Sequence, residues 1–407
     1  MLVQQWKNFF EKGALYVISI GIGLTVGLID TLFGLVLLQL TAYREAHFLP
    51  LVLFLAPVGI LILYCFQRFG ERSQEGMNLV FEAGQGGDGT IPKRMVPFVV
   101  IGTWLAHLVG ASVGREGVAV QIGATVGHWF GKLTQATNQR WFIVIGMAAG
   151  FAGLFETPIA ATFFALEVLV VGRLYLNLLL PTLLAAFTAS WTSQLMGLEK
   201  FSFVLPGTLV FSWGLLVKLL LVAVCFSLAG RYFAQLLKFS KQFWSTKIAN
   251  PLVRIGLVSL FLSLLFLMFH FGRYSGLGTN LIQSSLAGGS IYSYDWLLKF
   301  VLTILTLSIG FPGGEVTPLF AIGATLGVFL ASVLGLPIVF IAAFGYIAVF
   351  GSATNTLLAP ILIGGEVFGW ENLPYFTLIC AISFSLNGNH SIYGRQKMVE
   401  ENLLPKD

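Results

Sequence analysis

Charged residues are scarce in this sequence. Only 10% of the 407 residues are Asp, Glu, Lys or Arg, made up of 18 acids and 23 bases, and 57% are hydrophobic. A soluble domain usually carries about a quarter charged residues, so these charges cannot coat a soluble globule of this size. No long polar stretch interrupts the apolar sequence. We therefore expect lipid to face much of the chain, which forms one membrane domain.

The usual chemical groups of an enzyme are also lacking. The three cysteines, Cys65, Cys225 and Cys380, lie within apolar sequence and are interpreted as buried packing residues, not disulfides or metal ligands. The five histidines have no metal-ligand spacing, and no nucleophile–base pair or phosphate-binding loop is evident. These absences disfavour a polytopic membrane enzyme. We expect no catalytic residue, cofactor or metal and, because the bases are scattered, no nucleic-acid partner.

Apolar segments recur from residue 13 to residue 386, but few of them are long. The segments 13–40 and 49–69 exceed the roughly 20 residues that cross a bilayer, whereas many later ones are short and interrupted by glycine or proline. Broken helices are tolerated inside a membrane only where the freed backbone groups are buried or line an aqueous site. This pattern is typical of transporters and channels. Residues 1–12 predict a short interfacial helix before the first span.

The two halves of the chain resemble each other. GREGV at 114–118 precedes QIGATVG at 121–127, and GEVTP at 314–318 precedes AIGATLG at 321–327. A Gly-rich break followed by a small-residue helix in each half is the expected trace of a repeat transporter. Chance similarity between Gly/Ala-rich membrane helices is the alternative, and the sequence leaves open whether the repeats are inverted.

Glu116 lies between glycines at the start of an apolar helix. A carboxylate at membrane depth is costly, so it normally faces a cavity or a partner. At a helix N-terminus it is held by free N–H groups and the helix dipole, and the same groups would bind an anion once the carboxylate is protonated and moves away. Glu116 is therefore either a proton carrier that competes with an anion, or a capping acid.

Three motifs in order resemble the CLC family of chloride channels and proton-coupled antiporters. GREG at 114–117 is similar to the gating-glutamate motif, GEVTP at 314–318 to its partner motif, and Tyr393 to the tyrosine that lines the central anion site. The resemblance covers about residues 10–395. It implies an all-α polytopic fold with two inverted-topology repeats and many short, broken, tilted helices. It also implies a homodimer.

The resemblance suggests boundaries within the chain. The transmembrane domain would cover 13–395, with repeat halves at about 13–197 and 213–395. A short tail would follow at 396–407.

Several departures from the chloride members resemble the CLC-F branch, the bacterial fluoride/proton antiporters. Gly76-Met77-Asn78 stands where an anion-facing serine is usual, Val118 replaces a proline and Val316 a phenylalanine. Val168 follows Glu167 where proton-coupled chloride members have a second, inner glutamate. The resemblance implies export of cytoplasmic fluoride in exchange for protons across a bacterial inner membrane, with Glu116 as gating and proton-carrying residue.

Two further candidate residues, Glu315 and Thr317, have two interpretations each. Glu315 is an auxiliary acid for proton or fluoride passage or a first-turn acid held by the helix dipole. Thr317 donates its hydroxyl to the anion or caps its helix. The other residues expected at the anion site are Met77, Gly117, Val118, Val316 and Tyr393. Glu167 and Glu366, at equivalent places in the two halves, are interpreted as structural acids that hydrogen-bond to neighbouring helix ends.

Two related functions remain as alternatives. A chloride/proton antiporter with an unusual lining is disfavoured by Val168 in the inner-glutamate position. A passive anion channel is compatible with Glu116, since channels of the family also keep this residue. The expected partners are fluoride and protons, chloride as a further anion, and the lipid bilayer.

Overall fold

The computed structural model describes residues 2–87, 89–134 and 138–399, and for residues 2–12 it describes the backbone alone. This part of the chain is almost entirely helical. The first half contains α1 (Leu2–Ala46), α2 (Phe48–Val52), α3 (Leu55–Phe69), η1 (Glu71–Glu75), α4 (Met77–Gly84), α5 (Met95–Leu108), α6 (Glu116–Leu133), α7 (Gln139–Phe155), α8 (Pro158–Glu167), β1 (Val170–Val171), η2 (Leu176–Leu178) and α9 (Leu179–Leu195).

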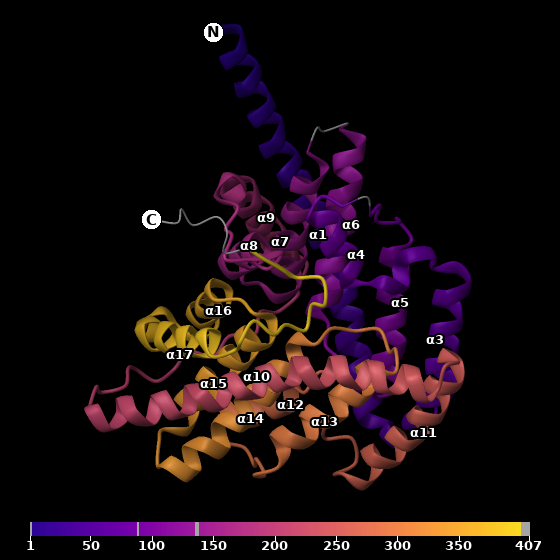
Figure 1. Ribbon diagram of the computed structural model, residues 1–407, viewed down its shortest axis with the longest axis vertical. Coiled ribbons are helices and arrows are strands. Elements are labelled where there is room, and N and C mark those ends of the chain that lie inside the picture. The colour runs from indigo at the N-terminus through magenta and orange to yellow at the C-terminus, as the bar shows by residue number, and fades with distance from the viewer. Residues whose placement is uncertain (1, 88, 135–137, 400–407) are drawn as a thin grey trace.

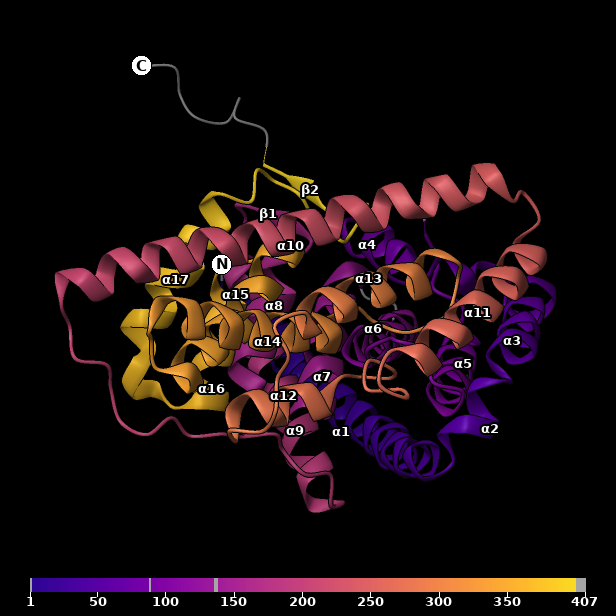
Figure 2. The same ribbon diagram turned by 90° about the horizontal axis from the view of Figure 1, so that it is seen from below.

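The second half repeats this order of helix lengths. It contains α10 (Trp213–Lys247), α11 (Pro251–Met268), α12 (Thr279–Leu286), α13 (Asp295–Ser308), α14 (Val316–Leu334), α15 (Ile338–Thr354), α16 (Leu358–Phe368), η3 (Trp370–Asn372), α17 (Leu373–Ser385) and β2 (Lys397–Met398). In Figure 1 the helices of the first half gather above and to the right of those of the second, and Figure 2 shows α10 as one long rod across the second half.

Among the described residues, four helices are long and apolar enough to cross a membrane: 13–46 of α1, α10, α11 and α14. Their apolar side chains are divided between the core and the outer surface. In α11, for example, Ile255, Leu262 and Phe266 are buried while Leu257, Leu260 and Leu264 are exposed. Apolar outer faces of this extent are typical of contact with lipid or with another protein. The fold therefore agrees with the composition, which predicts contact with lipid.

Most of the other helices are too short to span the bilayer, as the broken apolar segments predicted. The expected single span at 49–69 is divided: α2 ends at Val52 and α3 begins at Leu55. Pro57 in the first turn of α3 marks the break, because it has no N–H to donate to Leu53 O and its ring would clash with that carbonyl in a continuous helix. The predicted interfacial helix at 1–12 is continuous in the backbone with α1, and its position relative to a membrane stays a prediction. Within the predicted tail, β2 pairs in parallel with β1, and residues 400–407 lie outside the described part.

The repeated IGAT sequences form the closest helix contacts in each half. A Cβ atom on Gly123 of α6 would lie 2.0 Å from the carbonyl oxygen of Gly146 in α7, and one on Gly323 of α14 would lie 2.0 Å from that of Gly345 in α15. Only glycine permits this approach of two backbones, as in other membrane helix pairs with small residues at their interface. The same close helix contact thus explains why both halves have glycine at these positions.

The two halves also cap each other. Glu167 at the end of α8 accepts hydrogen bonds from the backbone N–H groups of residues 357–359, where α16 begins. Glu366 in α16 accepts hydrogen bonds from Ile159 and Ala160 at the start of α8. Each acid satisfies helix N–H groups that have no partner within their own helix. The predicted hydrogen bonds of both glutamates to neighbouring helix ends are confirmed, and the reciprocity is what two inverted repeats produce.

Candidate anion and proton site

The two Gly-rich motifs meet at the boundary between the halves. Gly114 N–H donates to the carbonyl oxygen of Gly314 at 2.6 Å, and Gly314 N–H donates back to Gly114 at 2.8 Å, in an antiparallel bridge. A Cβ atom on Gly114 would lie 2.9 Å from the Gly314 oxygen. Because α6 and α14 begin immediately after these glycines, the bridge brings the N-termini of both helices together.

Glu116, the first residue of α6, lies between these two helix starts. Its side chain is almost completely buried. Its Oε2 atom accepts a hydrogen bond from the Thr317 hydroxyl, a second from Thr317 N–H at 3.2 Å and a third from Arg115 N–H at 3.3 Å. Arg115 Nε is 3.7 Å from the other carboxylate oxygen. The carboxylate thus occupies N–H and O–H donors at the start of α14, which favour negative charge.

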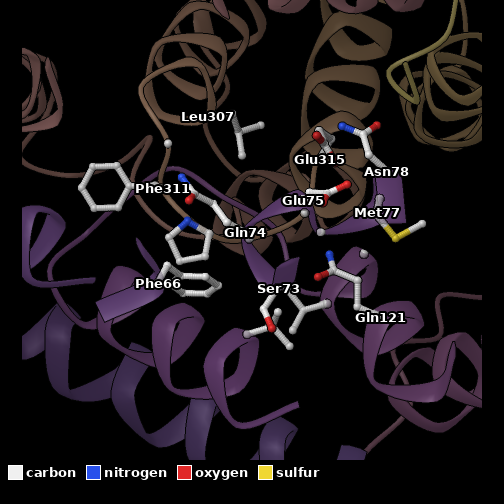
Figure 3. Close-up of a pocket in the computed structure, with 18 of the residues that line it drawn as sticks. Phe66, Ser73, Gln74, Glu75, Met77, Asn78, Gln121, Leu307, Phe311 and Glu315 are labelled. Atoms are coloured by element: carbon white, nitrogen blue, oxygen red, sulfur yellow. The ribbon is translucent and has the colours of Figure 1, made fainter. Parts of the chain in front are cut away.

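A cavity of about 280 Å³ adjoins this arrangement. Its lining includes Met77 and Asn78 at the start of α4, Gly117, Val118 and Gln121 in α6, the segment 310–315 before α14, and Tyr393. In Figure 3 Met77, Asn78 and Gln121 lie on one side of the cavity, with Phe66 and Phe311 on the other. The N-terminal ends of three helices, α4, α6 and α14, therefore face one space.

Tyr393 is held at the cavity by a segment without helix or strand structure. Ile392 N–H donates to Ala353 of α15 at 2.9 Å, and Tyr393 N–H donates to the Ser391 hydroxyl at 3.1 Å. The ring of Phe81 in α4 packs against the Tyr393 ring, with centroids 4.9 Å apart. These contacts fix the ring from both halves of the chain, so its phenol can donate to a bound anion at the cavity wall.

Ion pairs surround the cavity next to η1. Glu75 of η1 accepts two hydrogen bonds from the Arg72 guanidinium, at 2.6 and 3.0 Å. Glu82 of α4 is bonded to Arg72 at 3.1 Å and to Arg395. The hydrogen bond from Arg72 holds the pKa of Glu75 below its ordinary value. Two acids and two bases are therefore paired at this place.

The sequence matches known proteins over most of its length. A family model described as voltage gated chloride channel matches residues 58–388. The chain belongs to the voltage-gated chloride channel (CLC) family.

Two CLC relatives are similar over nearly the whole chain. A "Chloride/fluoride channel protein" of Pseudomonas syringae pv. tomato is 35% identical over 386 residues, which cover 93% of this chain and 85% of the relative. A crystal structure described as a CLC-type fluoride/proton antiporter is 56% identical, with a TM-score of 0.95, and covers 96% of this chain and 99% of that one. A slow cyanobacterial Cl⁻/H⁺ antiporter, 19% identical with a TM-score of 0.83, covers 93% of this chain and 96% of that one, and shows the fold alone.

The CLC fold brings most of the predicted site residues together. Met77, Gly117, Val118, Glu315 and Tyr393 line the cavity. Thr317 instead contacts the Glu116 carboxylate. Val316 is buried at the start of α14, outside the cavity lining.

Sequence reasoning missed several polar residues of this CLC protein. Asn78, Gln121 and Lys241 all line the cavity. A side-chain amide or an ammonium group can donate hydrogen bonds to an anion. Asn78 follows the predicted Met77 directly, and Gln121 lies one turn beyond Gly117, so helical spacing from residues already singled out would have found both. No such signal points to Lys241, because α10 is far away in the sequence.

The described residues contain no group of three His, Cys, Asp or Glu side chains placed to hold a metal ion. The three cysteines are free thiols; Cys380 is buried, as predicted, whereas Cys65 and Cys225 are only partly buried. What the site offers chemically is a buried, hydrogen-bonded carboxylate at Glu116, a second carboxylate at Glu315, and neutral N–H and O–H donors.

Proposed function

We propose that this chain is a fluoride/proton antiporter that exports cytoplasmic fluoride. The observation that carries the proposal is the Glu116 carboxylate on the helix-start donors of α14. A small anion would use the same backbone N–H groups, so anion and carboxylate exclude each other. The 56% identity to a structure described as a CLC-type fluoride/proton antiporter supports fluoride as the anion.

The exchange follows from competition at one position. When Glu116 takes up a proton, it loses the negative charge that holds it against Thr317 and the dipole of α14, and its side chain can swing away. Fluoride then takes the backbone N–H groups that Glu116 has left. When Glu116 releases its proton, the carboxylate returns to these groups and expels fluoride. Proton and fluoride thus move through the same space in opposite directions, without the inner glutamate that Val168 replaces.

Glu315 and Tyr393 complete the path from the cavity. The half-buried Glu315 is the N-cap residue of α14 and lines the cavity, so it can pass protons between the cavity and Glu116. Tyr393 supplies a phenolic donor to an anion on the same wall. Fluoride is small and strongly hydrated, and several close donors are needed to replace its water. Gly117 contributes a backbone N–H group at the start of α6, whereas Val118 N–H donates to Arg115 O at 3.1 Å and Val118 contributes only to the lining.

Selectivity against chloride would depend on Met77. A serine hydroxyl at this place suits the larger chloride, and Met77 cannot donate a hydrogen bond. Met77→Ser should therefore raise chloride flux relative to fluoride flux in reconstituted protein. An unchanged ratio would remove Met77 from the account of selectivity. Since the Pseudomonas relative is named for both anions, chloride belongs in every assay.

The proposed setting is a bacterial inner membrane, with the protein as a homodimer that carries one pathway per subunit. The exposed apolar faces of the long helices supply the surface for lipid and for a second copy. Fluoride that enters the cell as its neutral acid and dissociates there would be the substrate.

Fluoride efflux from proteoliposomes, followed with a fluoride electrode and a pH probe while chloride is measured in parallel, tests the proposal. Wild-type protein should move fluoride faster than chloride, and Glu116→Gln should lose the proton movement that accompanies it, because glutamine carries no exchangeable acid proton. Glu366→Gln is the matched control, a half-buried carboxylate that caps α8 away from the cavity. Chloride flux that exceeds fluoride flux would refute fluoride as the substrate.

A further inference from the structure

Some charged side chains around the cavity are paired and others are not. The lining contains three of them, Glu75, Glu315 and Lys241. Glu75 is paired with Arg72 and lies 3.9 Å from Arg395, and these two bases also bind Glu82. This group of two acids and two bases has no net charge. Within the described part of the chain Glu315 and Lys241 form no ion pair; Glu315 is half-buried, so Lys241 carries the exposed unpaired charge of the cavity lining.

Lys241 faces the cavity because of its position on α10. The buried face of this helix runs through Phe226, Gly230, Phe233 and Leu237, which are three or four residues apart. The next position on this face is residue 241. The apolar stem of Lys241 therefore continues a packed surface, while its ammonium group is exposed and lines the cavity.

Lys241 also lies near the acid that leads to the anion site. Its charge interacts with that of Glu315, but the two groups form no ion pair within 4.0 Å. Lys241 thus remains available to a mobile ion, whereas the other bases beside the cavity are engaged by glutamates. A single cation at the rim of a cavity raises the local concentration of anions.

On the basis of the proposed function, we propose that Lys241 recruits the transported anion into the cavity from the solution. It acts before the anion reaches Glu116 and holds no anion in the final site. The ammonium attracts small anions by charge and not by shape, so recruitment serves fluoride and chloride alike. Selection between them is left to the residues deeper in the cavity.

The expected effect is modest and depends on salt. Removing one unit charge at a solvated rim changes the local anion concentration by about two- to fivefold at low ionic strength. The anion concentration for half-maximal flux should rise by this factor, while the maximal rate and the ratio of protons to anions stay unchanged. In about 1 M of a salt whose anion is not transported, where the Debye length is roughly 3 Å, the effect should vanish.

A charge exchange at one position tests this proposal. The variant Lys241→Cys is made in a background in which Cys65, Cys225 and Cys380 are replaced by alanine. The protein is reconstituted into liposomes and treated from outside with membrane-impermeant methanethiosulfonates. A trimethylammonium reagent restores the positive charge, and a sulfonate reagent introduces a negative one. Only molecules whose cavity faces the outside react, and initial anion uptake before and after labelling reports their change. Lys238→Cys, exposed one turn earlier on α10 and absent from the cavity lining, is the matched control.

Recruitment predicts opposite effects of the two labels at position 241, toward wild-type behaviour with the cation and further away with the anion. At position 238, one turn from the cavity lining, the same labels should have clearly smaller effects. Equal effects of both labels would mean steric obstruction and overturn the proposal, as would equal responses at 241 and 238. If the unlabelled protein moves chloride and not fluoride, the proposed function fails, and recruitment is read from chloride flux. A protein that moves neither anion refutes both.

Discussion

The hydroxyl of Thr317 allows the competition between carboxylate and anion to be measured. It is one of three donors on the same oxygen of Glu116, and the other two are N–H groups at 3.2 and 3.3 Å. A hydrogen bond to a charged group contributes about 1.5–3 kcal/mol. Thr317→Val removes the hydroxyl and keeps the shape of the side chain. At the lower end of this range, it should release Glu116 from its docked position about tenfold more often.

A less firmly docked carboxylate leaves the site more accessible to fluoride. Thr317→Val should therefore lower the fluoride concentration for half-maximal flux by up to about tenfold, as measured by initial rates in proteoliposomes. Thr317→Ser, which keeps the hydroxyl, should behave like the wild type. In a Glu116→Ala background, where no carboxylate competes, Thr317→Val should have little effect.

The alternative role of Thr317 gives the opposite result. If its hydroxyl serves the anion, Thr317→Val raises the half-maximal concentration both with and without Glu116. An increase in the Glu116→Ala background would thus refute the reasoning from the observed hydrogen bond.

Three further predictions concern the structure around the site. Gly114→Ala should destabilise the protein by about 1–3 kcal/mol in thermal unfolding, because its Cβ would lie 2.9 Å from the Gly314 carbonyl oxygen. The control Gly214→Ala should not destabilise the protein, because its Cβ would have no atom within 4 Å. Equal melting temperatures of the two variants would contradict the tight bridge. Glu366→Gln should cost about 1–2 kcal/mol of stability by weakening the cap on α8, with proton coupling retained, and lost coupling would show that the acid is more than structural. The hydrogen bond from Arg72 lowers the pKa of Glu75 in the folded protein. The ion pair therefore makes its full contribution to the free energy of unfolding above about pH 4.3, the ordinary glutamate pKa. This contribution disappears as the pH falls through the lower pKa of the folded state. Glu75→Gln should therefore flatten the acid limb of a stability profile, and an unchanged limb would mean that the pair contributes nothing.

The sequence was informative where function depends on short, local patterns. Glu116 could be identified because a carboxylate between glycines in an apolar segment has few structural reasons to be there. The capping roles of Glu167 and Glu366 could be predicted from their equivalent places in the two halves. The repeated IGAT motif indicated two equivalent halves, and the structure adds that its glycines allow close helix packing.

Other features depend on contacts between distant segments and left no local signal. The position of Lys241 at the cavity is set by the register of α10 against residues more than a hundred positions away. The hydroxyl of Thr317 had two open readings, since only the structure brings Glu116 to it.

The central claim is that Glu116 exchanges a proton for fluoride at one position. The most direct test loads proteoliposomes with fluoride, clamps the membrane potential at zero with a potassium ionophore, and follows the internal pH after dilution into fluoride-free buffer at equal pH. The account predicts that outward fluoride movement drives protons inward against the gradient that develops, and that Glu116→Gln abolishes this while Glu366→Gln does not. Fluoride loss with no proton movement in the wild type would contradict the antiport mechanism and leave a passive anion pathway.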